Sequence, residues 1–265
     1  MQMKILGSIG ILSWFYLVSL SFGANLAPHE AYYTMDLVKQ ENSNDIISDV
    51  RGMMLINHEM TCEGWTSVER LQMQVKFKNS RTVLQNLQFS GWESDDGRLY
   101  RFASQGRTPL KTYKIRGFAK ISLGDSKVNY LIPKKFSSKL PMDTKFPIGF
   151  IAHVLDQAKA GEKNIHLHFF DGTDLNGPEW VKILVLGPSK AEVSEDLKNE
   201  SLLSGIGYKM RITSFSIKKN LSDPLYSYDA VFLENGIMVG AILEFEGFKV
   251  LQSLKMIKPF EHPVC

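Results

Sequence analysis

Two histidines one residue apart, His166 and His168, form the pattern most suggestive of metal chemistry in this sequence. Residues i and i+2 of a β-strand point to the same face, so both imidazoles could approach one ion, with Asp171 or Asp174 as a third ligand. Such ligands suit zinc or copper and would indicate a metal-dependent hydrolase. The apolar residues that alternate with the histidines also fit an ordinary strand with one polar face. That simpler interpretation is favoured, and we expect no metal, no cofactor and no catalytic residue.

Carboxylates beside a tryptophan suggest a second kind of chemistry. Glu93, Asp95 and Asp96 follow Trp92, and paired carboxylates next to an aromatic ring are typical of glycosidases. The same residues lie around an Asp-Gly pair that predicts a hairpin turn, and a solvated turn explains them better than catalysis. The sequence also lacks a nucleophile elbow, a zinc-protease helix motif and a phosphate-binding loop. We therefore expect a protein that is not an enzyme.

The composition indicates a globular protein. The chain has 265 residues, of which 44% are hydrophobic and 22% charged, which excludes a disordered or collagen-like chain. Its 31 Lys and Arg residues are nearly matched by 28 Asp and Glu residues, which leaves a net charge of +3. Because the basic residues scatter among the acidic ones, we expect no nucleic-acid partner.

The N-terminal segment has the order of a secretory signal peptide. Lys4 precedes an apolar run from Ile5 to Leu20, and the small residues Gly23 and Ala24 follow. A membrane anchor is the alternative, but the run is short for a span that needs about 20 apolar residues. We therefore expect a signal peptide at residues 1–24 and a single exported domain at residues 25–265.

The two cysteines of the sequence, Cys62 and Cys265, favour one disulfide bond in an exported chain, because the destination is oxidising. A terminal cysteine is otherwise hard to explain, since chain ends fray unless they are held. Two free thiols remain the alternative. A redox role is weaker, because the sequence contains no Cys-x-x-Cys motif.

Alternating hydrophobicity predicts a mainly β fold. Residues 65–78 alternate between apolar and polar side chains, as in a half-buried strand, and residues 82–92 repeat the pattern. Asn235-Gly236 and three similar turn signals predict hairpins. Residues 146–161 break the pattern with an apolar stripe of helical spacing, Pro147 near the start and Gly161 at the end. We expect about fourteen strands in a single large curled antiparallel sheet around this one helix.

Aromatic residues suggest a possible binding groove. Trp65, Trp92, Trp180, Phe89 and Tyr100 could line a cleft for an apolar or extended ligand. Packing in the core of a β-rich protein is the alternative.

Several sequence blocks, in order, resemble the envelope-integrity EipB family of alphaproteobacterial periplasmic proteins. They are Ala27-Pro28-His29-Glu30-Ala31-Tyr32-Tyr33, Arg51-Gly52-Met53-Met54, Thr61-Cys62-Glu63-Gly64-Trp65-Thr66, Phe89-Ser90-Gly91-Trp92-Glu93-Ser94-Asp95-Asp96-Gly97, Phe169-Phe170-Asp171-Gly172-Thr173-Asp174 and the terminal Cys265. The resemblance implies a β-spiral of about fourteen strands, similar to periplasmic lipoprotein carriers, and a disulfide between Cys62 and Cys265. The chain departs from the family at Pro147-Ile148-Gly149, which puts in doubt any role tied to the start of the helix.

Three hypotheses about function follow. The first is a non-enzymatic periplasmic protein that supports envelope integrity by binding an envelope protein, lipid or polymer on its curled sheet. It would be peripheral to the membrane at most. The second is a carrier of an apolar ligand or a lipoprotein acyl chain. The third and weakest is a hydrolase built on His166, His168 and Asp171.

Overall fold

The computed structural model describes residues 25–265 except 39–46, 80, 109–110 and 219–222. The predicted signal peptide, residues 1–24, lies outside the described residues. In chain order the elements are β1 (His29–Leu37), β2 (Ile47–Thr61), β3 (Gly64–Phe77), β4 (Thr82–Ser94), β5 (Leu99–Arg107), β6 (Thr112–Lys120), β7 (Lys127–Ile132), β8 (Phe136–Lys139), α1 (Pro147–Lys159), β9 (Asn164–Phe169), β10 (Glu179–Ser189), η1 (Glu195–Leu197), η2 (Ser201–Leu203), β11 (Gly207–Ser216), β12 (Pro224–Leu233), β13 (Met238–Phe245) and β14 (Phe248–Pro259).

The described strands form one sheet of fourteen, in the order β8-β7-β6-β5-β4-β3-β2-β1-β14-β13-β12-β11-β10-β9. Every neighbouring pair is antiparallel. β1 lies in the middle and pairs with both β2 and β14, so the first strand meets the last. We call β2–β8 the first wing and β9–β14 the second wing. The predicted large antiparallel sheet of about fourteen strands is confirmed.

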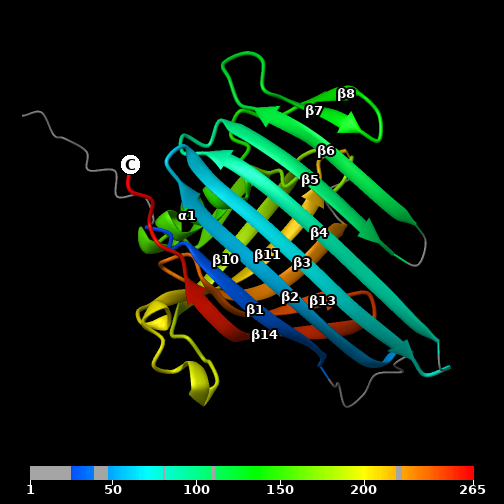
Figure 1. The fold of residues 1–265 in the computed structure, drawn as a ribbon, viewed down its shortest axis with the longest axis vertical. Helices are drawn as coiled ribbons and strands as arrows, with labels where there is room; N and C mark the ends of the chain where they lie inside the picture. Colours follow the sequence, from blue (N-terminus) through cyan, green and yellow to red (C-terminus); the bar gives the residue numbers. More distant parts are fainter. Residues whose placement is uncertain (1–24, 39–46, 80, 109–110, 219–222) are drawn as a thin grey trace, which may run out of the picture.

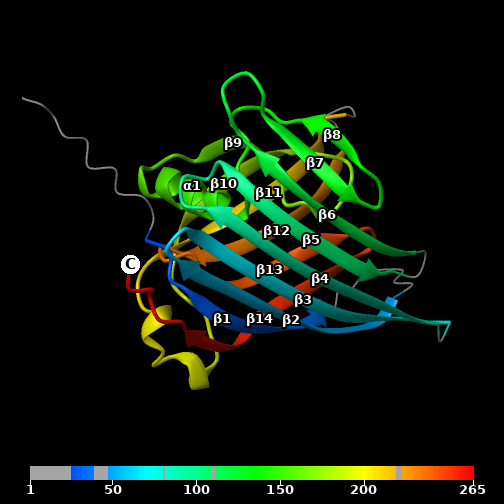
Figure 2. The same cartoon turned by 45° about the horizontal axis from the view of Figure 1, so that its top comes forward.

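The sheet curls on itself so that β3–β6 lie in front of β10–β13, and α1 lies between the wings at the end nearest the C-terminus (Figures 1 and 2). Among the described residues one parallel bridge joins Lys145, in the segment between β8 and α1, to Phe169 at the end of β9. There the Lys145 amide donates to the His168 carbonyl (2.8 Å), and the Phe170 amide donates to the Lys145 carbonyl (3.0 Å). A single bridge does not close the sheet into a continuous barrel.

The predicted helix is confirmed at Pro147–Lys159. Pro147 occupies the first turn, and Gly161 follows the last turn with φ of +92°. The apolar stripe faces β9, β10 and β11 and is buried; its members are Ile148, Phe150, Val154, Leu155 and Ala158. Among the described residues no helix is both long and apolar enough to span a membrane.

Alternation along the strands separates an inner face from an outer face. In β3, Met73 and Val75 are buried, whereas Gln72, Gln74 and Lys76 are exposed. The same alternation holds through β4, β5 and β6. In the pairing of these strands, each outward residue lies opposite an outward residue of the neighbouring strand. The predicted hairpin turns are also present, and Gly236 at the β12–β13 turn has φ of +86°.

Candidate functional site

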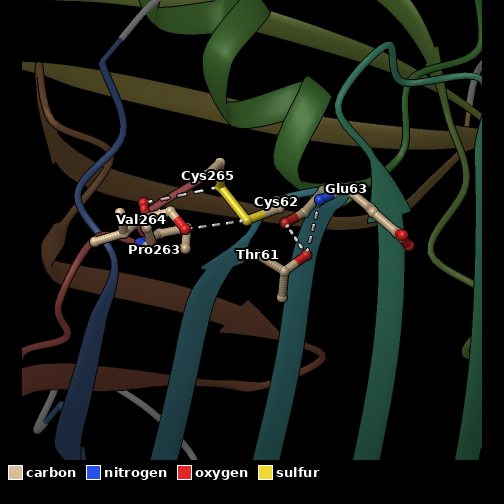
Figure 3. The surroundings of a disulfide bond; sticks show 7 residues. Thr61, Cys62, Glu63, Pro263, Val264 and Cys265 are labelled. Atoms are coloured by element: carbon tan, nitrogen blue, oxygen red, sulfur yellow. Dashed lines mark hydrogen bonds between the residues drawn. A yellow bond between two sulfur atoms is a disulfide. The ribbon is translucent and has the colours of Figure 1, made fainter.

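A disulfide bond joins Cys62 and Cys265 at one end of the sheet (Figure 3). Cys62 lies in the turn between β2 and β3, and Cys265 ends the segment after β14, with 5.6 Å between the two Cα atoms. The Phe260 amide donates to the Pro28 carbonyl (3.0 Å), which holds the start of this segment beside β1. The bond therefore ties the first wing to the segment that follows the last strand of the second.

The turn that carries Cys62 packs tightly against β4. The Thr61 hydroxyl donates to the Gly64 carbonyl (2.8 Å) and closes the turn. Gly64 has φ of +153°, and a Cβ at this position would lie 2.0 Å from the Glu93 carbonyl oxygen. Only glycine fits here. The disulfide turn and the end of β4 at Glu93 are thus in direct contact.

Glu93 holds the start of α1 from inside the curl. Its carboxylate accepts hydrogen bonds from the amides of Ile148 and Gly149, both at 2.9 Å, and Glu93 is only 3% exposed. These are orphan amides of a helix N-terminus, which favours a negative charge. Burial nevertheless raises the pKa of Glu93 to about 7, against the lowering effects of the two amides and of Lys145. The interpretation of Glu93 as a solvated turn residue is therefore wrong, although Asp95 and Asp96 are exposed.

The departure from the family at Pro147-Ile148-Gly149 falls at this contact. A Cβ on Gly149 would lie 2.8 Å from the Glu93 Oε1 atom, so the carboxylate occupies the space that a side chain would need. The helix has no side-chain cap at Phe146, and Glu93 from β4 takes that role.

Strand pairing brings together two histidines that the sequence separates. His29 and His58 lie directly opposite each other in β1 and β2, with ring centroids 5.5 Å apart. His29 Nδ1 lies 2.7 Å from the Ala27 carbonyl oxygen, and His58 Nδ1 lies 3.0 Å from the Ser67 hydroxyl. Burial and the neighbouring His29 lower the pKa of His58 to about 3, and burial lowers that of His29. Both rings are therefore uncharged at neutral pH.

The inside of the curl also holds acidic groups without basic partners. Burial raises the pKa of Glu69 to about 7, and nearby Asp171 adds to the effect. Burial likewise raises the pKa of Asp171 and of Glu179, which accepts hydrogen bonds from Tyr226 (2.6 Å) and Ser214 (2.5 Å). Within the described part of the chain no lysine or arginine is buried. The interior is therefore an acidic environment.

The structure does not assemble the proposed His166–His168–Asp171 site. His166 is exposed on β9, and His168 pairs with Asp143 (Nδ1–Oδ1 2.8 Å), a residue that the sequence did not point to. The Asp171 carboxylate instead accepts from the amide and hydroxyl of Thr173, both at 2.9 Å. No three His, Cys, Asp or Glu side chains of the described residues are placed to hold a metal ion.

The five aromatic residues proposed to share a groove lie in different places. Phe89 and Tyr100 are buried in an inner cluster with other aromatic rings, and Trp65 packs against the cluster under α1. Trp92 lies on the outer face of β4, and Trp180 lies beside His168 on the second wing, with ring centroids 4.8 Å apart. The five residues therefore do not share one groove: Trp92 and Tyr100 border the groove described next, and core packing explains Phe89 and Trp65.

A groove does exist on the outer face of the first wing. It has a volume of about 640 Å³ and spans β4–β7. Its apolar lining includes Trp92, Leu99 and Phe118, of which the last two are 42% and 43% exposed. Arg101 and Arg116 also line it, and the Arg101 guanidinium lies 5.2 Å from the centre of the Trp92 ring. An open apolar channel with two cations can bind a ligand that is both apolar and negatively charged.

A pocket between α1 and the sheet, by contrast, is very small. The cavity lined by Phe150, Val154 and Met210 has a volume of about 10 Å³, no more than one water molecule requires. A ligand of any size is better accommodated on the outer face than beneath this helix.

Three comparisons with known proteins bear on this fold. The model of the EipB-like family matches residues 22–261. The cell envelope integrity protein EipB of Brucella abortus (strain 2308) is 24% identical over 236 residues, which cover 88% of this chain and 84% of that protein. A crystal structure of a β-barrel-like protein of a domain of unknown function, also from Brucella abortus, aligns with a TM-score of 0.80 and 22% identity. That alignment covers 90% of this chain and all of the other, and it supports the same fold.

Proposed function

Because this chain belongs to the EipB-like family, we propose that it is a non-enzymatic protein that supports the integrity of the cell envelope. It binds a component of the envelope on the outer face of its curled sheet. The name of the Brucella relative supports the envelope role. The observation that carries the binding role is the open groove of about 640 Å³ on the first wing.

The proposal includes export. Residues 1–24 act as a signal peptide, and residues 25–265 form one periplasmic domain. The Cys62–Cys265 bond supports this placement, because such bonds persist in oxidising compartments and both sulfurs lie on exposed residues.

A deletion strain tests the proposal. Wild-type protein should restore resistance to detergent, whereas Leu99→Ser with Phe118→Ser should not, because the change removes the apolar lining of the groove. The matched control is Leu184→Ser with Leu225→Ser, which removes two leucines of similar exposure (43% and 41%) from the second wing. Equal protein levels and melting temperatures exclude a folding defect. Full restoration by the groove variant would overturn the proposed binding site.

A carrier of an apolar ligand is a second candidate, favoured by the same apolar lining of the groove. Native mass spectrometry of the protein taken from the envelope tests it. Extra mass that disappears on denaturation, and that is absent from the Leu99→Ser/Phe118→Ser protein, would support the carrier. Wild-type protein without extra mass would contradict the carrier and favour the first proposal, a protein that binds a component of the envelope.

A further inference from the structure

The outward positions of β3–β6 carry a one-sided set of charges. Strand alternation and cross-strand pairing place seven basic residues there, and we call this surface the basic face. Its cations are Arg70, Lys76, Arg101, Arg107, Lys114, Arg116 and Lys120, all exposed. None of them has an ion pair within the residues that the structure describes.

Within β3–β6 no carboxylate shares this face with the cations, and Asp49 of β2, which lies opposite Lys76, forms its ion pair with Arg51. Strands β3–β6 contain only two acidic residues, Glu69 and Glu93. Both occupy inward positions, where burial raises their pKa to about 7. The alternation of the strands therefore places the cations on the outer face and the two carboxylates on the inner face.

Apolar side chains lie among the cations. Leu99 and Phe118 are directly flanked by basic residues, because Leu99 pairs with Lys120 and Phe118 pairs with Arg101. Leu123, in the turn after β6, is 94% exposed. A surface that alternates cations with exposed leucine and aromatic side chains matches the boundary between lipid headgroups and acyl chains.

We propose that the basic face docks onto a bilayer that contains anionic phospholipid, which specifies the envelope component of the proposed function. The cations meet the headgroup phosphates, and Leu99, Phe118 and Leu123 enter the outer part of the acyl layer. The charge complementarity selects an anionic surface over a neutral one. The exposed apolar residues select a bilayer over a soluble polyanion, which offers nothing apolar to bury.

Vesicle co-sedimentation tests this proposal with protein purified from the envelope. The wild-type protein should sediment with vesicles of phosphatidylcholine and phosphatidylglycerol, but not with phosphatidylcholine alone, and added salt should weaken the binding. Arg101→Gln with Arg116→Gln should lower the affinity about 25-fold, since each cation near an anionic surface contributes about fivefold.

The control removes the same net charge from the second wing. Lys209→Gln with Lys255→Gln should change the affinity by less than about twofold, because both exposed lysines lie outside the basic face. Phe118→Ser should weaken binding without changing its salt dependence. All variants should melt at the wild-type temperature.

Three results would overturn the proposal. They are equal losses from the arginine and lysine variants, equal binding to both kinds of vesicle, and binding of dextran sulfate in place of vesicles. If vesicles do not bind but Arg101→Gln/Arg116→Gln fails to restore the deletion strain, the bilayer proposal is wrong, and the outer face supports the envelope by binding a different partner. If that variant restores the strain and vesicles do not bind, the outer face itself is excluded from the function.

Discussion

On the outer face of β3–β6, seven cations share the surface with no carboxylate of the same four strands, whereas on β11–β14 the side chains of Arg211, Asp229, Glu244 and Lys249 are paired across strands. Arg211 donates to Asp229 (3.0 Å) and to Glu244, and Lys249 donates to the other oxygen of Glu244 (2.7 Å). We call this second surface the paired face. Hydrogen bonding from Lys249 and Arg211 lowers the pKa of Glu244, and hydrogen bonding to Glu244 raises that of Arg211.

The contrast shows how a nearly neutral chain can present a strongly basic surface. A net charge of +3 spread evenly would give neither face a marked sign. In β3–β6 the two acidic residues, Glu69 and Glu93, point inward, so the opposite charges of these strands lie on opposite faces of the sheet. The paired face satisfies its charges internally, whereas the basic face leaves its cations free for a partner.

The largest expected effect comes from breaking the covalent link between the wings that carry these faces. Cys62→Ser should lower the free energy of unfolding by up to about 5 kcal/mol, because the bond constrains a very long loop in the unfolded chain. Chemical denaturation of the variant and the wild type measures the difference. The reduced wild type is the control and should match the variant; an unchanged midpoint for Cys62→Ser would show that the bond does not stabilise the fold.

A smaller effect concerns Glu93, whose carboxylate points inward from β4 and not onto the basic face. The folded pKa of Glu93 is about 7, against 4.5 as its ordinary value, so the folded state binds this proton more tightly than the unfolded state. The stabilising contribution of Glu93 is therefore complete below about pH 4.5 and is lost as the pH rises through about 7. Relative to Glu93→Gln, the wild type should lose about 3 kcal/mol of stability across this range.

Denaturation curves of both proteins from about pH 4.5 to 8 provide the measurement. Glu69, His29 and His58 also titrate in a way that depends on folding, but they are shared by both proteins and cancel in the difference. Asp96→Asn, in the neighbouring turn, is the control and should leave the slope between about pH 5 and 8 unchanged. Parallel curves for Glu93→Gln and wild type would mean that Glu93 keeps an ordinary pKa.

The smallest effect compares the two faces directly. Glu244→Gln should destabilise the protein by about 1 kcal/mol, because it leaves two cations of the paired face with weaker partners. Lys114→Gln on the basic face should change stability by no more than a few tenths of a kcal/mol, since Lys114 has no carboxylate to lose and its neighbours are also basic. Thermal melting at low and high salt measures both. Equal destabilisation by the two variants would contradict the distinction.

The fold was largely accessible from the sequence because its signals are local. Alternation over residues 65–78, Asn235-Gly236 at a tight turn, and Pro147 and Gly161 around an apolar stripe each depend on a few neighbouring residues. The disulfide was accessible because the chain has only two cysteines.

The contacts of the candidate site depend on segments far apart in the chain. Glu93 resembles a turn residue until the amides of Ile148 and Gly149 are placed beside it, and the His29–His58 pair exists only in the register of β1 with β2. Trp92 and Phe89 are both aromatic, but they point to opposite faces because their positions in the strand differ by three, an odd number.

One signal of the basic face was present but missed. Residues 97–124 contain seven lysines and arginines and no acidic residue, so the basic residues do not scatter evenly among the acidic ones. The total charge conceals this segment, whereas counting charge separately along each pair of predicted strands reveals it.

The central place of β1 sets the order in which the chain can complete its fold. Synthesis proceeds from the N-terminus, so β1 and β2 can pair early, while the other edge of β1 has no partner until β14 has been made. Until then the growing protein carries an open strand edge, the kind of surface that templates aggregation. A binding factor that shields His29–Leu37 during this interval would raise the yield of folded protein without touching its final stability.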